Sequence, residues 1–320
     1  MKNTCTARWL KFLCLSTFLF SGISRAAPKY KIAVIPKSDI AWWLKMKAGA
    51  QKAARELNAQ VFWAGTATED EVSKQAEIVE SFIGSADAIV LAPIEERGLL
   101  PSIEAAIARG KHVVVVDSPV KSSQVTSTLA TDNLNAGALG AREMAKALSG
   151  IKKPKVAVFR FMKNIPTTEG RSQGFIKEAE HLGKFEVVTT KIYAGPTSVT
   201  ALLAAQELIK KNPDLDGIFA VNWNAFQNLY LSMKKIGKAG KIKLVGVDEP
   251  EMCLEALRTG EVSAVIMQNP FNMGYLGVKA AVDAINGKKV QKKFDTGTII
   301  VTKENLDSTE IQSFLNPKVD

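Results

Sequence analysis

The stretch KIAVIPKSDIAWWLKMKAGAQKAARELN, residues 31–58, passes from a short apolar run into a segment with helical periodicity. The run at 31–35 is rich in β-branched residues, which favour a buried strand. Apolar residues then recur at the three- and four-residue steps of one helical face: Trp43, Met46, Ala50, Ala53 and Leu57. A strand followed by a helix that covers it is the repeating unit of an α/β fold.

Similar apolar runs recur along the chain at spacings of about 25 to 30 residues, the length of one strand plus one crossover helix. One series lies at 31–35, 61–63, 87–92 and 112–116, and a second at 155–159, 185–193, 216–221, 242–247 and 263–267. No segment rich in Pro, Gly or Ser separates the two series, so the connection should be a tight hinge. We predict an α/β protein of two lobes, each with a mainly parallel sheet covered on both faces.

The first 26 residues differ from the rest of the chain. Basic residues precede the apolar run FLCLSTFLFSGI, and SRA ends at Ala26. An apolar run of this length is typical of a secretory signal peptide and is too short to span a membrane. We expect cleavage after Ala26, which leaves Cys253 as the single cysteine and excludes an internal disulfide.

The charge pattern excludes one class of partner. Part of the formal net charge of +10 lies in the expected signal peptide, so the mature chain is only mildly basic. Lysine pairs such as Lys152-Lys153 are typical of solvated surfaces, and no basic run is interleaved with aromatic residues. We therefore expect no nucleic-acid partner.

Planar polar residues follow the apolar runs at the point where ligands bind in open α/β sheets, beyond the carboxyl ends of the strands. They are Asp117, Asn222, Asp248 and Gln268. Each could cap the next helix, but each can also serve two adjacent hydroxyl groups. Arg171, in the loop and helix start after the run at 155–159, would add a rigid fork of donors. Four such residues from both lobes favour a ligand site between the lobes.

Trp42 and Trp43 suggest what the site binds. A sugar ring has polar edges and apolar C–H faces, so its site needs planar hydrogen-bonding groups and an aromatic ring over one face. Adjacent residues on a helix do not face the same way. We expect at least one tryptophan to contact the ligand, with the core as the alternative for the other. Trp223, next to Asn222, is a further candidate.

Several stretches together carry a family resemblance: AWWLKMKAGAQKAARELN, VVVVDS, ATDNLNAGALGAREMAK, EGRSQGF, NPDLDGIFAVN, KLVGVDE, VIMQNP and GKKVQKKF. Through them the chain resembles the periplasmic sugar-binding proteins of the ribose-binding type, over essentially the whole mature sequence. The resemblance implies two Rossmann-like lobes with parallel sheets, joined by a three-stranded hinge. It also implies ligand contacts at Trp42, Trp43, Asp117, Arg171, Asn222, Asp248 and Gln268.

The family topology implies three crossings between the lobes, near Thr131-Asp132, Gln268-Asn269 and Gly297-Thr298. The expected organisation is a signal peptide at 1–26, an N-terminal lobe at 27–131 plus 269–297, and a C-terminal lobe at 132–268 plus 298–320. Closure of the lobes around the solute would be a hinge motion.

The sequence departs from the ribose proteins at several contacts. Ile40 and Ala41 replace an asparagine and a proline, Ser118 replaces an arginine, and Pro196 replaces an aromatic ring. These changes favour a different pentose, a hexose or a polyol over ribose.

Lys37 and Ser118 also look like residues of the related receptors for furanose-shaped autoinducers, in which such a lysine reaches the ligand. Those receptors carry an aspartate where this chain has Arg171. For Lys37 we expect an ordinary exposed lysine, with a ligand contact as the alternative, and Ser118 is a further candidate contact.

The expected function is capture of a monosaccharide or polyol in the periplasm and delivery to the permease of an ABC importer. The alternative is a periplasmic receptor for a furanose-like autoinducer or sugar signal that feeds a chemoreceptor or sensor kinase. We expect a monomer with no cofactor and no metal.

We expect no enzymatic activity. The motif GRSQG matches the nucleophile elbow of hydrolases, but about ten residues separate Ser172 from the preceding strand, where that motif requires a direct turn. The downstream histidine, His181, should lie on the same helix.

Overall fold

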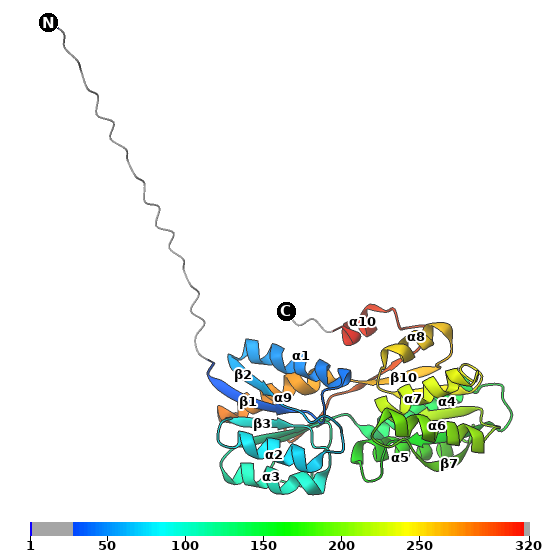
Figure 1. Cartoon of the computed structure of the whole chain (residues 1–320), viewed down its shortest axis with the longest axis horizontal. Coiled ribbons are helices and arrows are strands. Elements are labelled where there is room, and N and C mark those ends of the chain that lie inside the picture. The colour runs from blue at the N-terminus through cyan, green and yellow to red at the C-terminus, as the bar shows by residue number, and fades with distance from the viewer. Residues whose placement is uncertain (2–27, 317–320) are drawn as a thin grey trace.

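A computed structural model describes Met1 and residues 28–316, so the expected signal peptide and its cleavage site lie outside the described region. The chain forms two α/β lobes that lie side by side (Figure 1). Within residues 28–316, none of the helices combines the length and the apolar character needed to cross a membrane.

The N-terminal lobe is built on a six-stranded sheet of order β11-β5-β4-β3-β1-β2, in which every pairing is parallel. Its strands are β1 (Tyr30–Ile35), β2 (Ala59–Trp63), β3 (Ala88–Leu91), β4 (His112–Val116), β5 (Ser127–Ala130) and β11 (Lys293–Asp295). Helices α1 (Ala41–Glu56) and α9 (Pro270–Ile285) cover one face, and α2 (Val72–Phe82) and α3 (Glu96–Ala108) cover the other. The central strands β3 and β4 are buried apart from the partly buried His112 at the start of β4, which explains their continuous apolar runs.

The C-terminal lobe repeats this plan with the order β12-β10-β9-β8-β6-β7. Its strands are β6 (Lys155–Arg160), β7 (Glu186–Tyr193), β8 (Gly217–Ala220), β9 (Lys243–Val247), β10 (Ala264–Gln268) and β12 (Thr298–Val301). Its helices are α4 (Asn133–Ala147), α5 (Pro166–Leu182), α6 (Ser198–Lys211), α7 (Trp223–Lys235), α8 (Glu251–Thr259) and α10 (Thr309–Leu315). The pairing of β10 with β12 is antiparallel, and the other pairings of this sheet are parallel.

The chain passes between the two lobes after β5, after β10 and after β11, because α4 packs on β9 and β10, and α9 packs on β3 and β4. The predicted α/β class, with two lobes and mainly parallel sheets, is confirmed. The residue boundaries given above for the lobes stay a prediction.

In each lobe, two helices cross so closely that their backbones touch. A Cβ atom on Gly137 of α4 would lie 2.0 Å from the carbonyl oxygen of Arg171 in α5, and Gly174 of α5 meets α4 equally closely. In the N-terminal lobe, Gly49 of α1 and Gly274 of α9 make the same reciprocal approach. These glycines fix the positions of α1 and α5, which carry predicted site residues.

Candidate functional site

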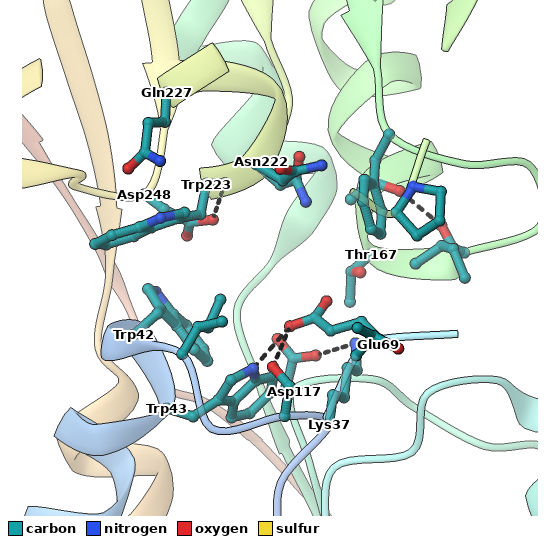
Figure 2. A pocket seen from close by; sticks show the side chains of 18 of the residues that line it. Lys37, Trp42, Trp43, Glu69, Asp117, Thr167, Asn222, Trp223, Gln227 and Asp248 are labelled. Atoms are coloured by element: carbon teal, nitrogen blue, oxygen red, sulfur yellow. Dashed lines mark hydrogen bonds and ion pairs between the residues drawn. The ribbon is translucent and has the colours of Figure 1, made fainter. Parts of the chain in front are cut away.

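A cavity of about 380 Å³ lies between the lobes and is lined by both of them (Figure 2). This volume is in the range of small-molecule sites. The lining includes all seven principal predicted residues together with Lys37 and Trp223. The tenth candidate, Ser118, is not among the lining residues and lies beside Asp117. The structure thus brings the predicted residues together at the carboxyl ends of the strands.

Trp42 and Trp43 both line the cavity and both belong to the core of the N-terminal lobe. Their rings pack edge to face, with centroids 4.6 Å apart and an interplanar angle of 81°. The first turn of α1 lies at the cavity edge, so each of the two large rings reaches both the core and the cavity. Contact of either ring with a ligand stays a prediction. Trp223, at the start of α7, packs from the other lobe against the same cluster.

The indole N–H groups of the two tryptophans differ. Trp43 Nε1 donates to Glu69 Oε1 at 2.8 Å. Trp42 Nε1 is buried and has no partner. A buried donor without a partner destabilises the folded state. A ligand acceptor in the cavity that bonds to this N–H would relieve that cost.

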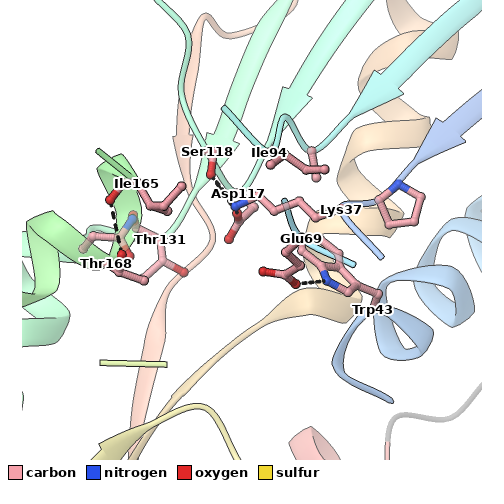
Figure 3. Close-up of polar contacts among 12 residues, drawn as sticks. Lys37, Trp43, Glu69, Ile94, Asp117, Ser118, Thr131, Ile165 and Thr168 are labelled. Carbon is pink, nitrogen blue, oxygen red and sulfur yellow. Dashed lines mark hydrogen bonds and ion pairs between the residues drawn. The ribbon is translucent and has the colours of Figure 1, made fainter. Parts of the chain in front are cut away.

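A buried polar cluster lies on the side of the cavity that the N-terminal lobe forms (Figure 3). Lys37 Nζ lies 2.6 Å from Asp117 Oδ2 and donates to Ser118 Oγ, also at 2.6 Å. Ser118 Oγ donates to Asp117 Oδ2 at 3.0 Å. The expectation that Lys37 is an exposed lysine is wrong, since it is only 5% exposed. The short side chain of Ser118 leaves room for the ammonium group, which Asp117 neutralises.

On the opposite side of the cavity, Asp248 is the centre of a second cluster. Its carboxylate accepts hydrogen bonds from Gln268 Nε2 at 2.6 Å and from the backbone N–H of Trp223 at 2.8 Å. The guanidinium of Arg171 lies 3.9 Å away. Burial raises the pKa of Asp248, and the charge of Arg171 opposes that rise. Gln268 Oε1 is buried without a partner, so it can accept a hydrogen bond from a ligand.

Arg171 is more constrained than the sequence suggested. It lies within α5 rather than at its start, and it is 2% exposed. Its Nε donates to Asn133 Oδ1 at 2.8 Å, and its Nη1 donates to the carbonyl of Val221 at 3.0 Å. Two of the guanidinium nitrogens, Nε and Nη1, therefore donate hydrogen bonds within the C-terminal lobe. Arg171 also lines the cavity.

Asn222 serves two roles at once. It lines the cavity, and its Oδ1 accepts from the backbone N–H of Ala225 at 3.2 Å as the N-cap of α7. The helix-capping alternative for this residue is thus correct, and it does not displace the residue from the cavity.

Asp117 and Asp248 share an unusual backbone. They follow β4 and β9 directly, one in each lobe, and have φ angles of 62° and 71°. Residues other than glycine rarely adopt this left-handed conformation, and such strain gathers at functional sites. Both carboxylates are aimed into the cavity by this turn of the chain.

The comparisons with known proteins agree with this geometry. A family model described as "Periplasmic binding protein domain" matches residues 32–289. The chain is 29% identical to the ribose import binding protein of Bacillus subtilis, covering 78% of this chain and 80% of the relative. It is 25% identical to the D-allose-binding periplasmic protein of Escherichia coli, covering 87% and 89%. This chain is a periplasmic binding protein of the ribose-binding type.

Solved structures of sugar-binding proteins share the architecture of this binding protein. A solute-binding protein of Agrobacterium radiobacter in complex with D-arabinose superposes with a TM-score of 0.84 at 30% identity, covering 90% of this chain and 99% of that chain. A solute-binding protein of Agrobacterium vitis with bound D-fucose gives a TM-score of 0.82 at 30% identity, covering 89% and 99%.

The sequence did not indicate Glu69 as a cavity residue of this binding protein. Glu69 lies in the loop between β2 and α2, is half-buried, and accepts from Ser38 Oγ at 3.4 Å as well as from Trp43. The strand-end rule inspects the residues that directly follow a strand. After β2 these are Ala64 and Gly65, and Glu69 comes later in the loop, so the rule did not select it. Other cavity residues without a sequence signal are Thr167, Thr168, Asn224 and Gln227.

Within residues 28–316, no three His, Cys, Asp or Glu side chains gather as metal ligands. The Ser172 hydroxyl, the nucleophile of the hydrolase alternative, is fully buried inside α5. It donates to the carbonyl of Thr168 in the same helix at 2.9 Å and accepts from Arg160 Nε at 3.3 Å. Its location favours a structural role in anchoring Arg160.

Glu69 should make the stability of the unliganded protein depend on pH. Burial raises the pKa of its carboxyl above the ordinary value of 4.5, and the charge of Lys37 opposes this rise. The folded state then binds this proton more tightly than the unfolded state, so the contribution of Glu69 to stability falls as pH rises above 4.5. Relative to Glu69→Gln, which does not titrate, the wild type should lose melting temperature as the pH increases.

Thermal unfolding of both proteins across a pH series measures this difference. Glu77→Gln is the control, because the Glu77 side chain is 66% exposed. A constant difference between wild type and Glu69→Gln across the series would contradict the prediction.

Proposed function

We propose that the protein binds a monosaccharide or polyol between its two lobes in the periplasm and delivers it to the permease of an ABC importer. The single observation that carries the proposal is a cavity with tryptophan walls and a rim of carboxylate, amide and guanidinium groups drawn from both lobes. Aromatic rings suit the C–H faces of a sugar, and planar polar groups suit its hydroxyls.

We assign ligand contacts to Trp42, Trp43, Asp117, Arg171, Asn222, Asp248 and Gln268, with Lys37, Glu69 and Trp223 as further contacts. Ser118 does not contact the ligand itself, but its hydrogen bonds hold Lys37 and Asp117 in place. The three passages between the lobes are the hinge, at the crossings and lobe boundaries given above. The protein acts as a monomer after removal of the signal peptide at Ala26.

Relatives and structural neighbours support a sugar as the ligand. Two structural neighbours hold D-arabinose and D-fucose, and the relative in Escherichia coli is a D-allose-binding protein, so these ligands are pentoses and hexoses. A curated relative in Mycolicibacterium smegmatis, 24% identical over 286 residues, is a xylitol-binding protein. These compounds define the panel to be tested.

A thermal-shift screen tests the proposal on mature protein that has been unfolded and refolded to remove bound ligand. A ligand at a hundred times its dissociation constant should stabilise the folded state by about 2.7 kcal/mol. The panel comprises pentoses, hexoses, polyols and a furanose autoinducer, with amino acids of similar size as controls. A shift with one sugar or polyol supports the proposal. A shift with the autoinducer alone favours the receptor function. No shift with any sugar, any polyol or the autoinducer contradicts both functions.

A further inference from the structure

One ion pair joins the two lobes at the edge of the cleft. Lys45 Nζ, in the second turn of α1, lies 2.6 Å from Glu249 Oε1, which directly follows Asp248. Among the ion pairs between described residues, this is the one that connects the N-terminal lobe to the C-terminal lobe. Neither residue belongs to the described lining of the ligand cavity.

The two partners are buried to different extents. The Glu249 side chain is fully buried, whereas that of Lys45 is 24% exposed. Glu249 Oε2 is buried and has no hydrogen-bond partner. The carboxylate therefore depends on Lys45 for its compensation, because a buried charge with a missing partner is strongly destabilising. The ammonium group of Lys45 can reach water without Glu249.

The Lys45–Glu249 pair lies on the same elements as the ligand site. α1 carries Trp42 and Trp43, and Glu249 is the next residue after Asp248. Trp223 lies beside both groups, since it lines the ligand cavity and also the separate hollow next to Lys45 and Glu249. Opening of the lobes would separate Lys45 from Glu249 and expose the carboxylate to water.

We propose that Lys45 and Glu249 set the ligand affinity without touching the ligand, by setting the free energy of lobe closure. The proposal rests on the proposed function of binding between two lobes. Lys45 is the residue that permits closure, because it compensates a carboxylate that closure buries. Affinity then depends on the closed fraction of the protein, since only that fraction has both halves of the site in place.

The two single variants should therefore differ. Lys45→Met leaves the buried Glu249 carboxylate without a cation and should weaken sugar binding about tenfold or more. Glu249→Gln leaves a partly exposed lysine and should change affinity about threefold or less. The double variant Lys45→Met/Glu249→Gln should recover most of the lost affinity, because no buried charge remains. Isothermal titration calorimetry with the sugar identified by the screen measures all four affinities.

Matched controls lie on the same elements. Lys47→Met removes a charge from α1 two residues away, where Lys47 lies over the Trp63 ring of its own lobe. Glu251→Gln removes an exposed carboxylate from the start of α8. Both controls should bind as the wild type does. Equal losses in Lys45→Met and Glu249→Gln, or additive losses in the double variant, would overturn the proposal.

A second measurement needs no ligand and so separates this proposal from the proposed function. Dyes on Ser85→Cys in the N-terminal lobe and Glu180→Cys in the C-terminal lobe, both exposed positions, report the closed fraction by single-molecule energy transfer. Lys45→Met should lower that fraction in the unliganded protein, and the double variant should restore it. If no sugar binds but the closed fraction responds in this way, the sugar function fails and the interlobe contact stands. An unchanged closed fraction in Lys45→Met overturns the contact.

Discussion

Replacing Asp248 with alanine should lower the affinity for the sugar by about 100-fold or more, because hydrogen bonds to a charged group are worth about 1.5–3 kcal/mol each. The carboxylate accepts from Gln268 and from the Trp223 N–H, and it faces the Arg171 guanidinium. Without the Asp248 carboxylate, the ligand loses a hydrogen-bond acceptor. Gln268, the Trp223 N–H and Arg171 also lose the partner that they share. Calorimetric titration of the sugar identified by the screen measures the loss.

Asp248→Asn is the matched variant, since it keeps the shape and one acceptor oxygen while removing the charge. Its loss should be smaller than that of Asp248→Ala. The fold should persist in both variants, because Arg171 remains bonded to Asn133 and Val221. An Asp248→Ala variant that is folded and binds within threefold of the wild type would remove Asp248 from the site.

Gly137→Ala should lower the free energy of unfolding by about 1–3 kcal/mol, as overpacking does in well-packed cores. The added methyl group would lie 2.0 Å from the carbonyl oxygen of Arg171, a contact that only separation of α4 and α5 relieves. Because this movement carries Arg171 with it, sugar affinity should fall as well. Denaturant unfolding and calorimetric titration measure the two effects.

Gly84→Ala is the control for this change. A Cβ atom at Gly84 would meet nothing within 4 Å, and its backbone does not require glycine. This substitution should leave the affinity unchanged and the stability equal or slightly higher, because alanine restricts the unfolded chain. Equal stabilities of Gly137→Ala and the wild type would show that the two helices tolerate separation.

The architecture was largely predictable from residue pattern. The apolar runs at 87–92 and 112–116 became β3 and β4, because strands buried on both faces must be apolar throughout. The helical stripe through Met46, Ala50 and Ala53 is fully buried, as its period requires. The strand-end rule also located Asp117 and Asp248, because parallel strands bring their carboxyl ends to one edge.

The partners of the site residues were not predictable in the same way. Periodicity states which face of a helix is buried but not which distant loop reaches it. Glu69 and Lys37 enter the cavity through loops without a periodic pattern, and their positions depend on Trp43 and Asp117, which lie far away in sequence. The bonds of Arg171 to Asn133 and Val221 likewise arise only when α4, α5 and β8 are packed together.

The left-handed backbone at Asp117 and Asp248 has a kinetic consequence. Both carboxylates are oriented by the chain itself and held by neighbours before any ligand arrives, so little side-chain ordering remains for the encounter. Sugars of similar size should then associate at similar rates. Discrimination among them would reside in how long each one stays bound.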